Sequence, residues 1–433
     1  MTFDMRNVCH KHLLIFLTLC FTGVGSLLHA QSAVEELYRD AMDAYYMGDH
    51  GKYLEKFISI QQELPESPVV WAHLTRAWSL NENADSAARY FIQRNKLILD
   101  PAFNAHDDLQ FLRSSAYWIG MEEMIARLAE NVGHADTAFQ LSSLVRHPEA
   151  LAFNPLDSSW LIGDVRQGFI TRYIKGVEEE LVPEGDQGLG AVMAIGVDPN
   201  EGHFFVANVR IPEWEKYTPG GSERSSIHVY HLKDGLFIHK IDHFDAGNDH
   251  LFGDILVYKD GTAFISDSYQ PLIFRLDNQI GLREHIRSEH LSSPQGMAIH
   301  SDSAILYVAD YSKGIVAFDL FTGEFLGRTL ESPEHSLKGI DGLYWHDGAL
   351  IAIQNGSVPK RILRLELRAD GRQVIHSSAV LNAHPALDEP TQGVILNDEL
   401  YFIANSPWLY YEERRELQLP TSYRPLILKC RLD

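Results

Sequence analysis

Six short stretches of the chain begin with a residue that is followed by an apolar run, and most of these starting residues could do chemistry. In chain order they are Glu149, Met193, Asp254, Gln295, Asp341 and Gln392. All except Met193 carry a carboxylate or an amide, whose oxygens are the ligands that a hard divalent cation such as Ca²⁺ prefers. Spacing alone leaves two interpretations open: a cation site, or polar side chains that satisfy one another and trapped water.

The elements that must position these residues are pairs of strands. Each starting residue opens a short run rich in Val, Ile, Phe and Tyr, which a polar turn joins to a second run. The second runs end at Asp164, Asn208, Asp267, Asp310, Gln354 and Asn405. From start to end the intervals are 15, 15, 13, 15, 13 and 13 residues. Two interval classes are what hairpins with two loop lengths would give.

Successive starting residues are 41 to 61 residues apart, a repeat length typical of four-stranded propeller blades. We therefore predict a mainly β fold, a six-bladed β-propeller over residues 133–433, whose first strands line a central channel. The segments 137–143 and 425–432 are candidates for the strand that closes the ring. If the second strands run away from the starting residues, Gln354, Asn355 and 405–408 form turns at the opposite rim.

Residues 31–132 have a helical pattern instead. Apolar residues recur at three- and four-residue spacing, and prolines at 65 and 101 end two successive helical pairs. With the Gly48–Asp49 turn, this period resembles tetratricopeptide repeats, which are helical hairpins of about 34 residues. The prediction is an α-helical tetratricopeptide-like repeat domain before the propeller, a scaffold suited to binding a protein partner.

The first thirty residues have the pattern of an export signal. Arg6 and Lys11 precede the apolar run 13–21, which weakens toward Ala30 and is too short for a confident membrane span. We expect residues 1–30 to be a cleaved signal peptide. The mature protein would then be extracytoplasmic, either periplasmic or secreted, with no membrane attachment.

Net charge and cysteine content limit the kinds of binding partner and metal site that the protein could have. The 433 residues carry 59 acidic and 37 basic side chains, for a formal net charge of −22. Such a surface repels nucleic acid, so we expect no nucleic-acid partner. Cys9 and Cys20 lie in the predicted signal, which leaves Cys430 alone in the mature chain. One cysteine forms neither an intrachain disulfide nor a cysteine-based metal site.

The stretches around four starting residues also resemble a known family. They read PEALAFNPLDSSWLIGDVRQGFITRY (148–173), GDILVYKDGTAFISDS (253–268), SPQGMAIHSDSAILYVADYSKGIVAFD (293–319) and GIDGLYWHDG (339–348). These stretches resemble the gluconolactonase, regucalcin (senescence marker protein) and luciferin-regenerating-enzyme group of six-bladed propellers. The resemblance covers residues 138–433 and implies a metal-dependent hydrolase that opens sugar lactones or related esters.

The resemblance also implies a ligand set. Glu149 and Asp341 match two metal ligands of the family, and Gln295 replaces an Asn ligand, which moves the amide oxygen outward by one methylene. Asp254 lies where many members carry a second Asn near the metal or the substrate. We therefore expect Asp254 to be both a metal ligand and a substrate contact. Ca²⁺ is the expected cofactor, with Zn²⁺, Mg²⁺ and Mn²⁺ as alternatives.

The mechanism that follows is hydrolysis of a small-molecule lactone or ester. The cation polarises the carbonyl, and Asp341, as the catalytic residue, takes a proton from water. Gln392 and His250 are further expected substrate contacts, His250 because its loop leads into Asp254 and loops at this end shape the pocket. The alternative is a non-catalytic extracytoplasmic binding or scaffold protein, since both halves are common interaction scaffolds.

Overall fold

The computed structural model describes residues 27–219, 225–243, 248–277, 281–301, 304–412 and 416–432. Contacts divide the chain into two compact units, one of residues up to Glu130 together with 357–359, and one of 131–356 with 360–433. The predicted signal peptide lies outside the described residues, except that residues 27–30 open the first described helix. None of the described helices is both long and apolar enough to cross a membrane.

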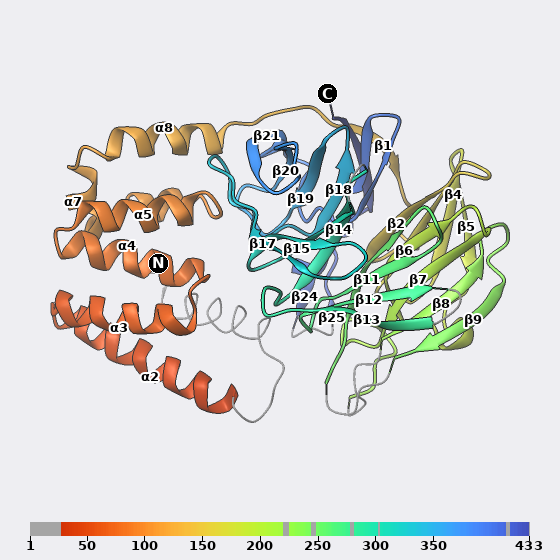
Figure 1. Cartoon of the computed structure of the whole chain (residues 1–433), viewed down its shortest axis with the longest axis horizontal. Coiled ribbons are helices and arrows are strands. Elements are labelled where there is room, and N and C mark those ends of the chain that lie inside the picture. Colours follow the sequence, from red (N-terminus) through yellow and green to blue (C-terminus); the bar gives the residue numbers. More distant parts are fainter. Residues whose placement is uncertain are drawn as a thin grey trace. The chain divides into compact units, whose positions relative to one another are not determined.

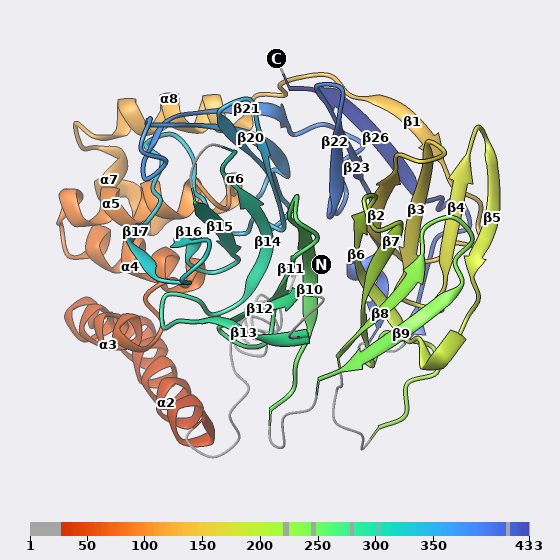
Figure 2. The ribbon, with the colours of Figure 1, turned by 45° about the vertical axis from the view of Figure 1, so that its right-hand side comes forward.

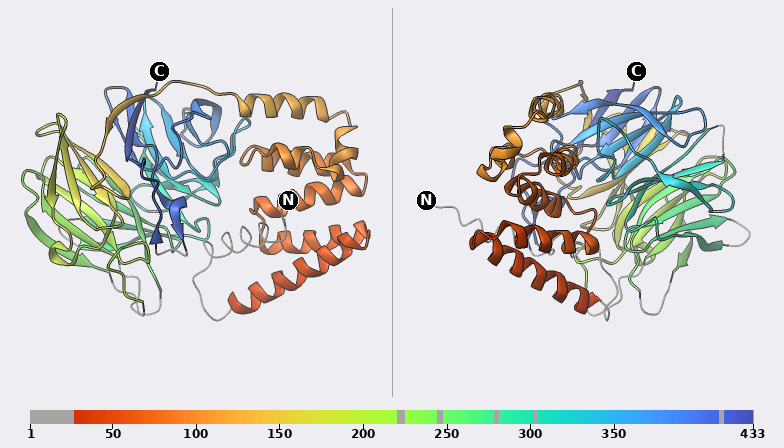
Figure 3. Two further views of the ribbon diagram at one scale, coloured as in Figure 1. Left: turned by 180° about the vertical axis from the view of Figure 1, so that it is seen from behind. Right: turned by 60° about the vertical axis from the view of Figure 1, so that its left-hand side comes forward.

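The first unit is helical (Figure 1). Its helices are α2 (Leu27–Tyr46), α3 (His50–Glu63), α4 (Pro68–Leu80), α5 (Ala84–Asn95), α6 (Pro101–Asn104), η1 (Asp107–Leu109), α7 (Gln110–Arg113) and α8 (Trp118–Ala129). Helices α2 and α3 pack as one pair and α4 and α5 as the next, and Figure 3 shows these helices from two further sides. The helical region is as predicted, and its assignment to tetratricopeptide repeats stays a prediction.

Local sequence explains where these helices begin. Asp49, Ser67 and Asn83 each accept a hydrogen bond from a backbone N–H in the first turn of α3, α4 and α5. Inside the unit, the Tyr53 hydroxyl and His73 Nδ1 are 2.7 Å apart. Burial lowers the pKa of His73 to about 3, so the ring stays neutral as part of the core.

The second unit is a six-bladed β-propeller, as predicted (Figure 2). Five blades are four consecutive antiparallel strands each. The first two blades are β2 (Pro148–Asn154), β3 (Ser159–Asp164), β4 (Ile170–Ile174) and β5 (Val177–Val182), then β6 (Ala191–Asp198), β7 (His203–Val209), β8 (Ser226–His231) and β9 (Phe237–Asp242). The third and fourth are β10 (Phe252–Val257), β11 (Ala263–Asp267), β12 (Leu272–Asp277) and β13 (Gly281–Arg287), then β14 (Pro294–Ile299), β15 (Ile305–Asp310), β16 (Gly314–Asp319) and β17 (Phe325–Thr329). The fifth is β18 (Gly342–His346), β19 (Ala349–Gln354), β20 (Arg361–Leu367) and β21 (Val374–Asn382).

The sixth blade closes the ring with both expected segments. It pairs β22 (Gly393–Leu396) and β23 (Glu399–Ile403) with β26 (Leu426–Arg431) and then with β1 (Asp136–Gln140). The start and the end of the unit therefore share one sheet, which removes two free edges. A short hairpin, β24 (Tyr411–Glu412) with β25 (Glu416–Leu417), lies between β23 and β26. Each predicted strand pair forms the first two strands of a blade.

Apolar side chains fill the spaces between blades. Phe205 of the second blade, for example, belongs to the same buried cluster as Ile255 and Phe274 of the third. Because this packing holds the blades side by side, the first strands face one another across the channel.

The second strand of each blade runs back toward the start of the first. Pro148 pairs with Asp164, and Pro294 with Asp310. The expectation that Gln354, Asn355 and 405–408 lie at the opposite rim is therefore wrong, because antiparallel pairing returns these residues to the end that carries the starting residues.

A β-bulge lies at the start of the first strand in four blades. In the first blade Glu149 falls between the pairs Pro148–Asp164 and Ala150–Gly163. In the third blade Gly253 has that place, because Asp254 itself pairs with Ser266. Asp254 thus lies one residue further along its strand than residue counting predicts. Bulges re-aim side chains and are common beside active sites.

Candidate functional site in the propeller channel

Three predicted residues, Glu149, Asp254 and Asp341, lie within electrostatic reach of one another. Burial and the charge of Asp341 raise the pKa of Glu149 to about 8. Burial, Glu389 and Asp254 raise the pKa of Asp341 to about 7. Burial raises the pKa of Asp254 to about 6. Like charges act this way when they are poorly hydrated, so Glu149 of the first blade and Asp254 of the third each lie near enough to Asp341 of the fifth for the charges to interact.

Glu149 is held from the sixth blade. The Ser406 hydroxyl and the Trp408 indole N–H donate hydrogen bonds to its Oε2, at 2.7 and 2.9 Å. His147 lies 4.0 Å from the same oxygen through Nε2, and its Nδ1 is 2.7 Å from the Tyr411 hydroxyl. Glu149 is only 6% exposed. Segment 406–411, which follows β23, therefore covers this carboxylate.

Asp341 is held by a chain of polar groups that the sequence analysis missed. Asn355 Nδ2 donates to Asp341 Oδ2 at 2.9 Å, and the Tyr311 hydroxyl donates to Asn355 Oδ1 at 3.1 Å. Lys360 Nζ donates to the Asn355 backbone oxygen and, at 2.9 Å, to Glu389 Oε2. Asn355 and Glu389 are 5% and 9% exposed. The signal that could have found them is their place in the chain: Asn355 and Lys360 follow a second strand, and Glu389 precedes a first strand.

The other predicted residues have different surroundings. Asp254 Oδ2 accepts a hydrogen bond from the Met297 backbone N–H at 3.0 Å. Gln295 Oε1 accepts from the Ser268 hydroxyl at 3.2 Å, and its Nε2 donates to the Ser293 hydroxyl at 3.1 Å. The Gln295 amide is thus positioned by two serines, and its role as a metal ligand stays a prediction.

Gln392 braces the channel. Its Nε2 donates to the backbone oxygens of Met193 and Gly253, at 3.0 and 2.9 Å. One side chain of the sixth blade therefore binds the second and third blades. Both amide hydrogens are used in this brace, and a substrate contact by Gln392 stays a prediction.

His250 lies among the strand-end groups. It is buried, and its Nδ1 is 2.5 Å from Oδ2 of Asp267, the residue that ends the second strand of the third blade. Its position explains how the loop before β10 is anchored, and its predicted contact with substrate is untested.

Tyr344 brings a phenol to the strand starts. Its ring packs against the apolar cluster of the fifth and sixth blades. The hydroxyl oxygen accepts a hydrogen bond from the Gly393 backbone N–H at 2.6 Å. A Cβ on Gly342 would lie 2.7 Å from that oxygen, so glycine leaves the space that the phenol uses. Burial, with smaller contributions from Asp254 and Asp341, raises the pKa of Tyr344.

The carboxylate oxygens of Glu149 and Asp341 are of the kind that a hard cation prefers. Glu149 and Asp341 each use one carboxylate oxygen in the bonds above, and no described residue donates to the other. Within the described residues, no three His, Cys, Asp or Glu side chains are placed to hold one metal ion. A cation here would therefore be held by at most two carboxylates, with amide, backbone or water oxygens completing its shell.

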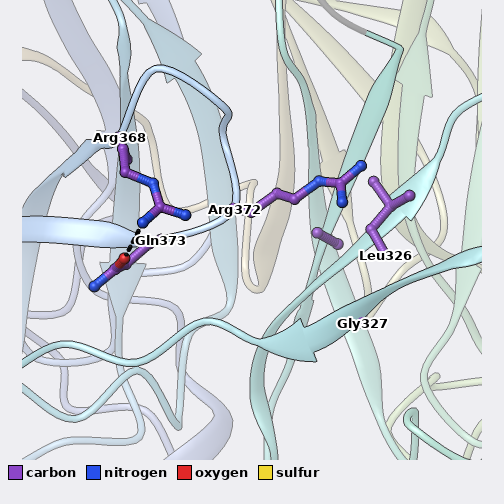
Figure 4. A pocket seen from close by; sticks show the side chains of 6 residues that line it. Leu326, Gly327, Arg368, Arg372 and Gln373 are labelled. Atoms are coloured by element: carbon purple, nitrogen blue, oxygen red, sulfur yellow. Dashed lines mark hydrogen bonds between the residues drawn. The ribbon is translucent and has the colours of Figure 1, made fainter.

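A separate cavity of about 350 Å³ lies on the outer strands (Figure 4). Its lining is Ala317, Leu326, Gly327, Arg368, Arg372 and Gln373. Arg368 forms an ion pair with Asp370 at 2.7 Å and donates to Gln373 at 2.9 Å. The cavity contains none of the predicted site residues.

Comparison with known proteins gives structural matches of low sequence identity and no match in sequence. No protein-family model matches the chain, and no curated protein matches it in sequence. A gluconolactonase from Xanthomonas campestris is 14% identical, with a TM-score of 0.48, over 71% of this chain and 92% of that one. A luciferin-regenerating enzyme is 12% identical, with a TM-score of 0.44, over 69% and 95%. A virginiamycin B lyase from Staphylococcus aureus is 13% identical, with a TM-score of 0.45, over 70% and 100%.

Proposed function

We propose that the propeller is an extracytoplasmic, divalent-cation-dependent hydrolase of a lactone or ester. The observation that carries this proposal is the pair Glu149 and Asp341, which come from different blades and are each held through one carboxylate oxygen. Burial and the charge of Asp341 raise the pKa of Glu149. Such a pair is unfavourable unless a proton or a cation neutralises it. The open oxygens of the pair are the ligands that Ca²⁺ would use.

The chain's own residues divide the work of this reaction. A bound cation would supply polarisation of the substrate carbonyl. Asp341, oriented by Asn355, accepts a proton from the attacking water and returns it to the leaving oxygen. The water oxygen bonds to the carbonyl carbon as the ring or ester C–O bond breaks, so one lactone and one water give one hydroxy acid. Ser406 and Trp408 fix the Glu149 carboxylate.

One observation favours a second candidate, a non-catalytic binding protein. Glu149 already accepts two hydrogen bonds from its own chain, and the described residues contain no three-carboxylate or histidine cluster for an ion. Carboxylates in this state could bind an amine or a hydroxyl-rich ligand without turning it over.

Three measurements distinguish these two candidate functions. They are metal analysis of the purified protein, calcium titration by calorimetry, and a panel of lactones and aryl esters with and without chelator. The hydrolase proposal expects bound or titratable cation and chelator-sensitive turnover. Cation binding and turnover should both be lost in Asp341→Asn. Calcium binding that is unchanged in Asp341→Asn would overturn the metal site, and a protein inactive on the whole panel would leave the binding function.

A further inference from the structure

We propose that the Tyr344 hydroxyl is the hydrogen-bond donor that stabilises the negative charge developing on the substrate carbonyl oxygen. This inference rests on the hydrolase function proposed above and names a further group for the same site. Tyr344 is not among the residues that the sequence motifs single out.

The position of the hydroxyl supports this role. It lies over Gly342 and beside Gly393, and these glycines directly follow Asp341 and Gln392, the starting residues of the fifth and sixth blades. Asp254 and Asp341 are both close enough to act on its charge. The phenol oxygen therefore lies at the strand starts of the fifth and sixth blades.

The hydrogen-bonding state of the phenol supports it as well. The oxygen accepts one hydrogen bond, from Gly393, and the hydroxyl donates to no other residue in the described part of the chain. A bond accepted by the oxygen polarises the O–H and makes it a better donor. Burial keeps the phenol protonated at neutral pH, so the proton is present when the oxyanion forms.

The Tyr344 hydroxyl would stabilise the transition state more than the bound substrate. As the water oxygen bonds to the carbonyl carbon, the π electron pair moves to the carbonyl oxygen, and a preplaced donor stabilises that charge. The phenol keeps its proton throughout, because the water proton passes to Asp341 and then to the leaving oxygen. Removal of one such donor typically lowers kcat by about 10²–10³-fold.

The test compares Tyr344→Phe with Tyr307→Phe. Tyr307 is a matched control. It lies on β15 of the fourth blade, its buried hydroxyl donates to the Gly371 backbone oxygen of the fifth blade at 2.8 Å, and it belongs to no part of the site. On the best substrate of the panel, Tyr344→Phe should lose about 10²-fold in kcat with KM and calcium affinity changed less than about threefold. Tyr307→Phe should keep the wild-type kcat.

A binding measurement gives a second readout. A phosphonate that mimics the tetrahedral intermediate should lose about as much affinity in Tyr344→Phe as kcat does, whereas a lactam that mimics the ground state should not. If Tyr344→Phe does not fold, the wild-type ultraviolet difference spectrum on phosphonate binding decides, since a tyrosine that becomes a donor to an anion shifts its absorption. Equal kcat in both variants, or no spectral shift, overturns the donor role alone. An inactive wild type that binds neither analogue overturns the proposed function and this inference together.

Discussion

Two sets of polar side chains lie at the same end of the propeller, and they differ in what satisfies them. At the strand ends, Asp310 accepts hydrogen bonds from the backbone N–H groups of Ser292, Ser293, Ser312 and Lys313, at 2.5 to 3.1 Å. At the strand starts, Asp341 accepts one hydrogen bond from a side chain and faces other carboxylates. Both residues are aspartates, but backbone N–H groups surround Asp310, whereas the surroundings of Asp341 include other carboxylates.

The difference distinguishes carboxylates that anchor loops from the carboxylates that we propose to act on a ligand. Burial raises the pKa of Asp164 to about 6, but four backbone N–H groups act against it, and no neighbouring carboxylate is involved. Asp164 and Asp310 each tie the loop entering a blade to the end of its second strand. Glu149 and Asp341 accept hydrogen bonds from side chains instead, and each keeps one oxygen to which no described residue donates. A cluster of incompletely neutralised carboxylates tends to bind a proton or a cation.

Exchange of the Asp341 carboxylate for an amide should have the largest effect. Asp341→Asn keeps the shape and removes the proton acceptor, so kcat/KM for lactone or ester should fall by about 10³-fold. Steady-state kinetics and calcium calorimetry measure it. Asp310→Asn is the matched control and should keep cation affinity. Similar losses in both variants would mean that the two sets are not functionally distinct.

Removal of a strand-end carboxylate should affect stability instead. Asp310→Ala leaves four backbone donors without their acceptor, which should cost about 2–4 kcal/mol in the free energy of unfolding. Urea unfolding measures this loss. Calcium affinity of the folded variant should match the wild type. A stability change below about 0.5 kcal/mol would contradict the anchoring role of this side chain.

The carboxylates at the strand starts should also make the stability of the cation-free protein depend on pH. The pKa values of Glu149, Asp341 and Asp254 lie above the range of unfolded carboxyl groups, so the folded protein binds more protons between about pH 4 and pH 8. Stability of chelated protein should therefore fall as pH rises through this window. Thermal unfolding from pH 5 to pH 8 measures the slope.

Two comparisons test whether these carboxylates cause the slope of stability against pH. Added Ca²⁺ should flatten it, because a cation replaces the protons, and Glu149→Gln should remove the part that Glu149 contributes. The same slope in the variant and with Ca²⁺ present would show that these carboxylates do not share a volume.

The smallest effect is expected at Gln392. Gln392→Leu removes the amide that binds Met193 and Gly253, and should lower the free energy of unfolding by about 1–2 kcal/mol. Calcium affinity should stay within about threefold of the wild type. A loss of calcium affinity as large as that of Asp341→Asn would move Gln392 from a structural brace to the cation site.

The sequence by itself determined the strands. Short apolar runs bounded by turn signals marked the first two strands of every blade, because strands that are covered on both faces are apolar at most positions. The same counting selected Glu149 and Asp341. Burying a carboxylate at the start of an apolar strand is unfavourable, so its presence there already indicated a role.

Only the tertiary structure decided what those residues meet. Asp254 was counted as equivalent to Glu149, and the bulge at Gly253 shifts it by one residue, which no local propensity records. Lys360, Glu389 and Trp408 lie outside the strands with no motif of their own, and Tyr344 lies in the stretch 339–348 without being singled out there. Lys360 and Tyr344 contact Glu389 and Gly393 because the fifth and sixth blades pack side by side. Trp408 contacts Glu149 because ring closure brings the sixth blade back to the first.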